Sequence, residues 1–553
     1  MLPSDYYLAN FNHLVDFVDS TYRELLDGEE LAWLQRLRES PKPAQQLYVR
    51  LLGRRATLFR ISRLSYPEIE SIPIAAGHLI EIGLASDGVG DDLSTLLRSF
   101  TKLELINRLA LDDVSKLSRV ELTDRIESAD PATRLRYVDL LESADSWIKI
   151  NGHHHFTLFS LCFFGNLYQD SSEFVRRDLG TLRYENYVIN ERQRPFTSRR
   201  QLESHLRYFE CDANSRSIDF DDKSALLSLA DQLPQRWPND HHLDRRIDRL
   251  RNRIARQLER LGEYRQALTL YNESINPPGR ERAARLLYKL EEYVHVKDVL
   301  AKIIAEPRGE AELQFAQQFS AKIGVLRSKR VKPFKPQTTK LALKESEARV
   351  EIAAKDFFSQ FGDCYYVENN LVDGVLGLFI WDIVFANVPG AFFNPFQSAP
   401  SDFYHQEFVD KRQILLDQRM QDLDDPIRFA ARVREIYESR YGIANPLVRW
   451  HKLPEQLLSK ALFRIPVEHW KSLFVRLLMD LRENSSGLPD LILFPADGGY
   501  ELIEIKGPGD AIQKNQRRWM HYFSEHNIPS RVVNVRWIQA TVVQDPIDIE
   551  TDV

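Results

Sequence analysis

The sequence is poor in cysteine and glycine, and it lacks both an excess of positive charge and a long hydrophobic run. Its three cysteines, Cys162, Cys211 and Cys364, form no C-x-x-C pair, which excludes a disulfide framework and a cysteine-rich zinc site and favours a reducing compartment. The 23 glycines among 553 residues are fewer than average usage predicts. Together with abundant Leu, Glu, Arg and Ala, this scarcity favours a mostly helical chain over extended β architecture.

The overall charge gives no argument for a nucleic-acid or membrane partner, because 74 basic residues face 80 acidic ones and leave a net charge of −6. Any basic surface must therefore be local. The start of the chain has no basic stretch followed by an apolar one, so we expect no secretory signal. The most apolar run, residues 371–385, contains Asp373 and Asp382 and is shorter than the roughly 20 residues that span a bilayer. We expect a cytosolic protein without membrane contact.

Two capping boxes stand out in the first third of the chain. Thr101 with Glu104 and Ser118 with Glu121 are each spaced to open a short amphipathic helix. The resulting helix–extended–helix unit resembles a SAP module, a family of small DNA-binding helical hairpins. The alternative is two ordinary helices of a larger helical domain.

Three adjacent histidines, His153, His154 and His155, suggest a metal site at first sight. Adjacent positions point in different directions on a helix, however, and no cysteine or carboxylate lies within five residues to complete a ligand set. We therefore expect these histidines to have a structural role, buried or at the surface.

A short repeat lies further along the chain, where residues 255–264 realign with residues 284–293 at an offset of 29. This spacing resembles shortened tetratricopeptide (TPR) repeats, whose period is about 34 residues, and such helix pairs stack to bury their faces. Two copies favour a spacer or docking element over a long peptide-binding groove.

Local charge departs from the overall balance in two places. Residues 245–265 contain eight arginines against three acids, and residues 326–336 contain five basic residues and no acid. Such stretches can neutralise phosphates, although a run of charge is also typical of a solvated helix face. The candidate DNA-binding residues from these stretches and from the first capping box are Lys102, Arg245, Arg249, Arg253, Lys329, Arg330 and Lys332.

The strongest signal is a predicted hairpin near the C-terminus. Two β-rich runs, residues 487–494 and 500–507, are separated by five residues that include Asp497, Gly498 and Gly499. Centring the turn on Asp497 gives a register with the pairs Phe494–Tyr500, Ile492–Leu502 and Asp490–Glu504.

This register places two carboxylates opposite each other. Asp490 and Glu504 share one face with Cα atoms within about 5.5 Å, and Lys506 lies on the same face two residues further on. Ile503 and Ile505 point the other way, into a core. Opposed like charges destabilise a sheet, and a Mg²⁺ or Mn²⁺ ion would relieve that repulsion, polarise a phosphodiester and activate water. A nearby lysine can orient that water or stabilise developing charge.

The alternative is a hairpin edge whose charges only block aggregation. The surrounding order favours a nuclease instead, because a helical stretch over 511–523 and a β-rich stretch over 531–537 complete a β–β–α–β unit. The segment resembles the PD-(D/E)xK nuclease superfamily, specifically the virus-type replication-repair nuclease (VRR-NUC) domain, with Pro489-Asp490 and Glu504-Ile505-Lys506 in the motif positions.

The order of a SAP-like unit, TPR-like helices and a VRR-NUC domain resembles the Fanconi-anaemia-associated nuclease family, tightly over 345–540 and loosely before it. We expect a multidomain protein whose N-terminal two-thirds are mostly α-helical and whose last domain is an α/β restriction-endonuclease-like fold. The expected segments are a helical domain (1–90), a SAP-like unit (91–135), a helical linker domain (136–240), TPR-like repeats (241–325), a basic linker (326–344) and the VRR-NUC domain (345–553).

The resemblance implies a set of site residues. Asp490, Glu504 and Lys506 would be catalytic, and one or two Mg²⁺ or Mn²⁺ ions would bind Asp490, Glu504, the Ile505 carbonyl and Glu351 on an upstream helix. Without the family, Glu345 and Glu347 would suit that last place equally well. Asp510 matches the acid of an acidic–basic pair after the motif and is a candidate for supporting the site, whereas Ala511 stands where the family has arginine.

The resemblance also implies an activity: 5′-flap endonuclease and 5′-to-3′ exonuclease cleavage of branched DNA, leaving 5′-phosphates, in interstrand crosslink repair. A junction-resolving nuclease with the same site and a non-catalytic TPR-type scaffold are the alternatives. The cysteine count excludes the ubiquitin-binding zinc finger of eukaryotic members, so we expect a bacterial-type member acting in the cytoplasm at the nucleoid. The oligomeric state stays open.

Overall fold

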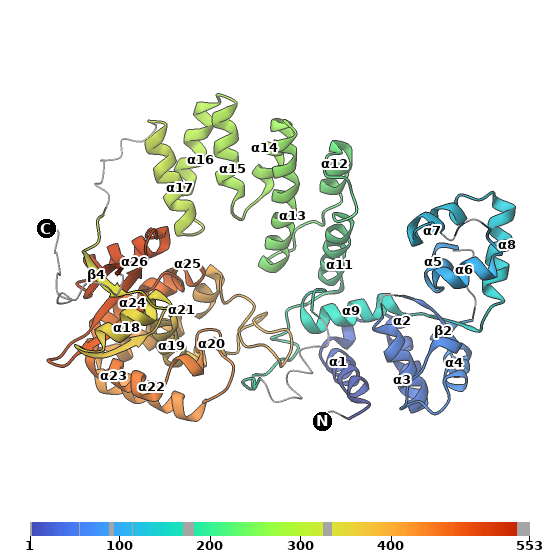
Figure 1. The fold of residues 1–553 in the computed structure, drawn as a ribbon, viewed down its shortest axis with the longest axis horizontal. Coiled ribbons are helices and arrows are strands. Elements are labelled where there is room, and N and C mark those ends of the chain that lie inside the picture. Colours follow the sequence, from blue (N-terminus) through green and yellow to red (C-terminus); the bar gives the residue numbers. More distant parts are fainter. Residues whose placement is uncertain are drawn as a thin grey trace. The chain divides into compact units, whose positions relative to one another are not determined.

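The computed structural model describes residues 3–54, 56–87, 93–112, 114, 116–169, 182–324 and 334–538. The chain divides into two compact units, the first formed by Met1–Thr181 with Arg194–Leu206 and the second by Leu182–Gln193 with Arg207–Val553. Helices dominate both units, as the composition predicted (Figure 1).

The first unit begins with helices packed on a small antiparallel sheet of order β1-β3-β2. The helix α2 starts at a capping box in which the side chain of Asp27 accepts from the backbone of Glu30 and the side chain of Glu30 accepts from the backbone of Asp27. The elements are α1 (Tyr6–Tyr22), α2 (Gly28–Glu39), α3 (Lys42–Leu52), β1 (Leu58–Arg60), α4 (Ile72–Glu81), β2 (Ala85–Ser86), β3 (Trp147–Ile150) and α9 (His153–Phe164).

Four short helices between β2 and β3 contain both predicted capping boxes. Thr101 caps α6 with Glu104, and Ser118 caps α7 with Glu121, so the prediction of two capped helices is confirmed. Their apolar sides, including Leu105 and Leu122, meet in a separate core. The assignment to a SAP module stays a prediction. The helices are α5 (Leu93–Arg98), α6 (Lys102–Arg108), α7 (Arg119–Glu127) and α8 (Pro131–Glu142).

The second unit contains a row of paired helices, drawn in green in Figure 1, and the sequence repeat coincides with their turns. Gly262 and Glu291, which are 29 positions apart, both have a positive φ, 84° and 62°. Each of these residues sits just before the start of a helix, at Tyr264 and Tyr293. The helices are α12 (Lys223–Asp231), α13 (His241–Arg260), α14 (Tyr264–Glu273), α15 (Gly279–Lys289), α16 (Tyr293–Ala305) and α17 (Glu310–Lys322). The preceding helix α11 (Arg199–Asn214) begins in the first unit and ends in the second.

The rest of the second unit is a five-stranded sheet of order β4-β8-β7-β6-β5 with helices on both faces. The strand β8 is parallel to β4 and β7, whereas β6 is antiparallel to β7 and β5. Ile503 and Ile505 pack with α18 on one face, as predicted, and Ile492 and Leu502 pack on the other. The elements are β4 (Thr338–Lys344), α18 (Val350–Phe358), β5 (Gly362–Tyr366), β6 (Leu491–Pro495), β7 (Glu501–Lys506), α26 (Lys514–Glu525) and β8 (Ser530–Ile538).

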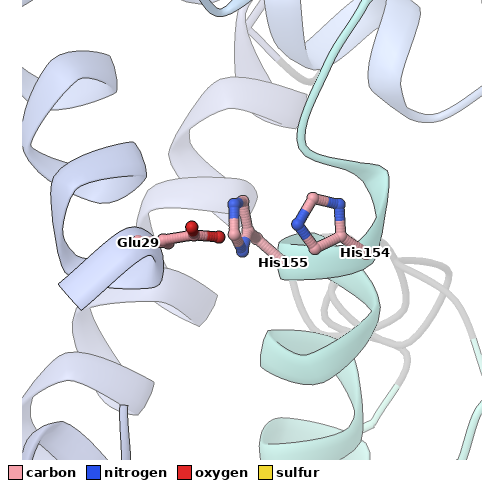
Figure 2. A group of neighbouring side chains, drawn as sticks. All are labelled: Glu29, His154 and His155. Carbon is pink, nitrogen blue, oxygen red and sulfur yellow. The ribbon is translucent and has the colours of Figure 1, made fainter. Parts of the chain in front are cut away.

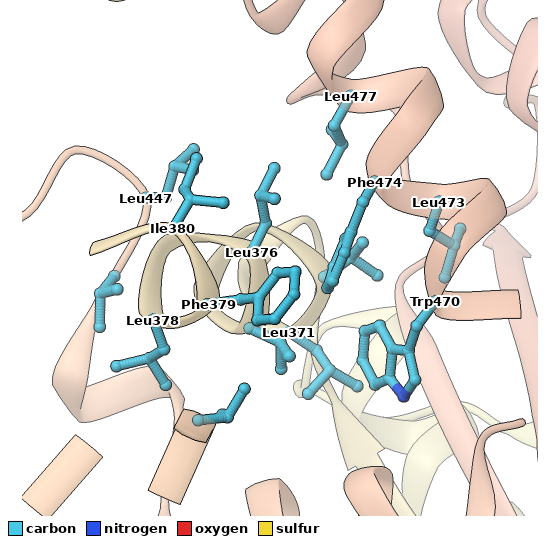
Figure 3. Close-up of a cluster of buried hydrophobic side chains, with 14 of the residues drawn as sticks. Leu371, Leu376, Leu378, Phe379, Ile380, Leu447, Trp470, Leu473, Phe474 and Leu477 are labelled. Atoms are coloured by element: carbon cyan, nitrogen blue, oxygen red, sulfur yellow. The ribbon is translucent and has the colours of Figure 1, made fainter. Parts of the chain in front are cut away.

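The apolar run at 371–385 is the centre of the larger core and not a membrane span. Every residue of α19 is buried, among aromatic and aliphatic side chains from α24 and neighbouring segments (Figure 3). A helix that is hydrophobic on all sides is typical of such a position. The surrounding helices are α19 (Asn370–Phe379), α20 (Trp381–Val384), α21 (Gln406–Gln421), α22 (Pro426–Ser439), α23 (Glu455–Arg464), α24 (Val467–Met479) and α25 (Leu481–Asn484).

The two acidic residues inside this run, Asp373 and Asp382, have different surroundings. Asp382 is held by Arg419 at 2.8 Å and Arg432 at 2.6 Å. Asp373 is buried, and burial raises its pKa well above the ordinary range. In the part of the chain that the structure describes, no helix is both long and apolar enough to cross a bilayer.

Candidate active site

The predicted hairpin register is confirmed. The strand β6 pairs with β7 through Leu491–Ile503, Ile492–Leu502 and Leu493–Glu501. Extending this register by two residues from Ile492 and Leu502 brings Asp490 opposite Glu504, where β6 begins. The two carboxylates therefore lie together at the end of neighbouring strands, as the sequence indicated.

Asp490 lies at the junction of three strand ends. Its Oδ2 accepts the backbone N–H of Ile505 at 2.9 Å. Its backbone carbonyl accepts the N–H groups of Val367 at 2.8 Å and Glu368 at 3.2 Å, which directly follow β5. The backbone and side chain of Asp490 therefore hold the end of β5, the start of β6 and the last residues of β7 together.

Glu504 and Lys506 are both buried, with side chains 1% and 9% exposed, and the Lys506 ammonium lies 2.8 Å from Oε1 of Glu504. Burial raises the pKa of Glu504, with a further increase from Asp490 and a decrease from Lys506. A buried carboxylate is costly to ionise unless nearby positive charge compensates it.

Asp490 is affected in the same direction. Burial raises its pKa, and the hydrogen bond from Ile505 opposes that change. Two further carboxylates, those of Glu351 and Glu368, also raise the pKa of Asp490 by repulsion. The site therefore gathers more negative charge than one lysine neutralises.

Glu368 was not among the residues predicted from the sequence. It raises the pKa of both Asp490 and Glu504, and its backbone bonds to Asp490. Its side chain is exposed and accepts a hydrogen bond from the Tyr366 hydroxyl. The only sequence feature that could have indicated Glu368 is its place just after a β-rich stretch. A carboxylate there reaches the site only if that strand lies next to β6, and the sequence does not show this pairing.

The predicted ligand Glu351 lies in the first turn of α18 and also acts on Asp490, but it is not among the groups that dominate the pKa of Glu504. Glu351 therefore acts mainly on one of the two central carboxylates, whereas Glu368 acts on both.

Two further predicted residues have clear positions. Oδ2 of Asp510 accepts the N–H of Gly507 at 3.2 Å, so this carboxylate closes the turn that follows Lys506. The side chain of Ile505 packs in the core beside α18. Its N–H points to Asp490, and because the N–H and C=O of one strand residue face the same edge, its carbonyl is directed to that edge as well.

The candidate DNA-binding residues have diverse surroundings. Arg245, Arg249 and Arg253 lie one turn apart on α13. Arg245 is largely buried and pairs with Glu407 at 2.8 Å, whereas Arg253 donates to the Ser215 hydroxyl. Arg249 is exposed and lines a cavity of about 730 Å³ that also borders Arg245.

The other candidates lie elsewhere. Lys102 is the first residue of α6 and is partly exposed. Lys329, Arg330 and Lys332 lie outside the described residues.

An aspartate at the start of one strand and Glu-x-Lys on its neighbour, in a sheet covered by helices on both faces, define a nuclease site of the PD-(D/E)xK class. Known proteins agree with this assignment. The VRR-NUC domain family matches residues 426–537, which include Asp490, Glu504 and Lys506, and the HTH domain family of FAN1 matches residues 5–86.

Relatives extend the match to nearly the whole chain. A Fanconi-associated nuclease 1 homolog of Pseudomonas aeruginosa is 33% identical over 545 residues, which cover 96% of each protein. An Arabidopsis thaliana homolog is 22% identical over 96% of this chain and 67% of the plant protein. The crystal structure of paFAN1 bound to 2nt 5′-flap DNA with a gap superposes with a TM-score of 0.82 at 31% identity, over 99% of this chain and 100% of that chain. The chain therefore belongs to the Fanconi-associated nuclease 1 family.

Proposed function

We propose that this chain is a structure-specific DNA nuclease that requires Mg²⁺ or Mn²⁺ and cleaves 5′-flap DNA. The observation that carries the proposal is the convergence of Asp490, Glu504 and Lys506 at one strand end. The solved relative with the same fold is described with a 5′ flap bound, which supports this substrate. By the same family relationship, we propose 5′-to-3′ trimming, products with 5′-phosphates and a role in crosslink repair at chromosomal DNA.

The residues present fit a hard divalent cation. Glu504 offers a buried carboxylate beside Lys506, Asp490 keeps Oδ1 beyond its bond to Ile505, and Glu368 adds an exposed carboxylate. Oxygen ligands of this kind suit Mg²⁺ and Mn²⁺. With the Ile505 carbonyl, Asp490, Glu504 and Glu368 form the ligand set that we propose, and Glu351 has a peripheral place. A bound cation polarises the phosphodiester and lowers the pKa of water.

The chain's own residues would then divide the remaining work. Lys506, held beside Glu504, is placed to orient the attacking water or to stabilise charge that develops on the scissile phosphate. Asp510 keeps the backbone after Lys506 in its turn. For the DNA, we propose that Lys102, Arg249 and the basic stretch with Lys329, Arg330 and Lys332 contact phosphates, because cationic side chains neutralise the charge of the DNA backbone.

The test is single-turnover cleavage of 5′-flap, 3′-flap and four-way-junction DNA in the presence of Mg²⁺. We expect the 5′ flap to be cut fastest, and we expect Asp490→Asn to reduce its cleavage at least about 10³-fold because the ligand and the hydrogen-bond acceptor for Ile505 are both weakened. Asp497→Asn, an exposed change in the turn of the same hairpin, is the matched control and should leave the rate within about twofold.

Each other outcome selects a different function. Faster cleavage of the four-way junction would favour a junction-resolving nuclease. Absence of cleavage by the unaltered chain would favour a scaffold in which the nuclease fold is structural. Equal rates for Asp490→Asn and Asp497→Asn would contradict the proposed site.

A further inference from the structure

A second group of potential metal ligands lies in the first unit, far along the sequence from the nuclease motif. Glu29 in the first turn of α2 faces His154 and His155 at the start of α9 (Figure 2). One ligand atom of each side chain lies within 4.8 Å of those of the other two. No carboxylate lies within five residues of these histidines in the sequence, and the fold brings one close from 125 positions upstream of His154.

We propose that Glu29, His154 and His155 bind a transition-metal ion, with Zn²⁺ as the representative, at a site separate from the nuclease carboxylates. Tetrahedral Zn²⁺ has bonds of about 2.0–2.1 Å to nitrogen and oxygen, which places its ligand atoms about 3.3 Å apart. The present separations, which lie within 4.8 Å, would shorten by up to about 1.5 Å on binding. Two of the three side chains, Glu29 and His154, are exposed and can turn, while His155 is 8% exposed and fixed.

The ligand atoms are available. Asp27 and Glu30, on either side of Glu29, form ion pairs with Arg199 at 3.3 and 2.6 Å. The carboxylate of Glu29 makes no hydrogen bond or ion pair with any described residue. Nδ1 of His155 is buried and has no hydrogen-bond partner among the described residues. A buried imidazole nitrogen without a partner costs free energy, which a metal bond would offset.

The backbone holds the two helix starts together. Gly152, the residue before α9, has a φ of 89°, and a Cβ there would lie 2.6 Å from Nε1 of Trp33 in α2. That indole donates to the Tyr48 hydroxyl at 2.7 Å, which in turn donates to the Asn151 carbonyl at 2.6 Å. Helix α9 therefore starts in direct contact with α2 and α3, and the ligand positions do not depend on a mobile loop.

The donor atoms select the kind of cation. The ligands lie at the N-terminal turns of two helices, where the helix dipole disfavours any cation, so binding depends on strong metal–ligand bonds. A weakly held hard cation such as Mg²⁺ would gain little from one exposed carboxylate there. Neutral imidazole nitrogens bind Zn²⁺, Ni²⁺ and Cu²⁺ well, so the site favours that class of metal. Water would complete the shell, and the bound ion would tie α2 to α9.

The test uses the full chain with Asp490→Asn, so that the nuclease carboxylates contribute less, in buffer with excess Mg²⁺. Binding of Zn²⁺ is followed by isothermal titration calorimetry, and Co²⁺ serves as a spectroscopic probe of coordination. We expect one saturable equivalent, a Co²⁺ visible spectrum of low coordination number, and a thermal midpoint raised by several degrees at saturating Zn²⁺.

Matched variants locate the ion. His154→Ala and Glu29→Gln alter exposed side chains and should weaken Zn²⁺ affinity at least about tenfold and several-fold, respectively. His78→Ala, in the same unit on α4, should leave the affinity unchanged. Thermal midpoints of all variants without metal check that the fold is intact. Equal Zn²⁺ affinity in the His154→Ala and His78→Ala variants, or absence of a saturable equivalent, would overturn the proposal.

Discussion

The two clusters of candidate ligands differ in how the chain assembles them. The nuclease carboxylates come from adjacent strands of one hairpin, where Glu504 is buried next to Lys506. The cluster of Glu29, His154 and His155 joins two helices that are distant in sequence, and two of its members are exposed. The first arrangement concentrates hard oxygen ligands in a site of low dielectric, whereas the second places one buried imidazole beside an exposed imidazole and an exposed carboxylate.

This contrast has an energetic consequence. Buried carboxylates repel one another, and the raised pKa values of Asp490 and Glu504 express the cost of ionising them side by side. Such a site gains most from a cation that neutralises it. Exposed side chains such as Glu29 and His154 are solvated without a metal, so the fold of the first unit does not depend on occupancy. We therefore expect a cation to stabilise the ionised nuclease site strongly, and the histidine cluster to bind one without depending on it for its fold.

The largest expected effect tests which carboxylates belong to the nuclease site. We expect Glu368→Gln to lower the rate of 5′-flap cleavage about 10²-fold, because Glu368 is bonded through its backbone to Asp490 and acts on both central carboxylates. Glu351→Gln should lower it by less than about tenfold, because its influence on Glu504 is weaker. Single-turnover rates over a range of Mn²⁺ concentrations measure both. A larger loss in the Glu351 variant would restore the ligand predicted from the sequence.

The difference between these two glutamates shows what sequence alone could provide. Asp490, Glu504 and Lys506 were predictable because hairpin register is a local property of strand alternation and turn length. The capped helices at Thr101 and Ser118 were predictable for the same reason. Their signals lie within a few residues of the structure they specify.

The remaining parts of both sites depend on contacts between distant segments. Glu368 joins the nuclease site because β5 pairs with β6, a contact across more than a hundred residues. Glu29 reaches His155 because Gly152 lets α9 start against Trp33. The histidine triplet is visible in the sequence, but the carboxylate that faces it comes from α2, a helix packed beside α9. Tertiary packing decides such cases, and one sequence does not display it.

An intermediate effect concerns the dependence of stability on pH. A carboxyl group with a raised folded-state pKa binds its proton more tightly in the folded chain than in the unfolded one. The contribution of Asp490 and Glu504 to the free energy of unfolding is therefore fully present below the ordinary carboxyl pKa of about 4. It is lost as the pH rises through their higher pKa values in the folded chain. In EDTA we expect the thermal midpoint of the second unit to fall by several degrees between acidic and mildly alkaline pH.

The control for this prediction is the double variant Asp490→Asn with Glu504→Gln, whose amides do not ionise. Its midpoint should vary less with pH than that of the unaltered chain, and the difference between the two curves isolates the pair from other titrating groups. Saturating Mg²⁺ should reverse the trend, because the cation binds the ionised carboxylates. Parallel curves for the two proteins in EDTA would show that repulsion in the nuclease site does not limit stability.

The smallest expected effect concerns Asp510, which supports the backbone beside the nuclease site and is not a proposed metal ligand. Asp510 accepts the N–H of Gly507 at 3.2 Å and so fixes the turn directly after Lys506. A hydrogen bond of this kind contributes about 0.5–1.5 kcal/mol, so Asp510→Ala should slow 5′-flap cleavage about two- to tenfold. Asp510→Asn keeps an oxygen that can accept the same N–H and should retain most of the rate. If both variants lose activity equally and by more than tenfold, the negative charge of Asp510 takes part in the site, and the carboxylate cluster at the strand ends has a further member.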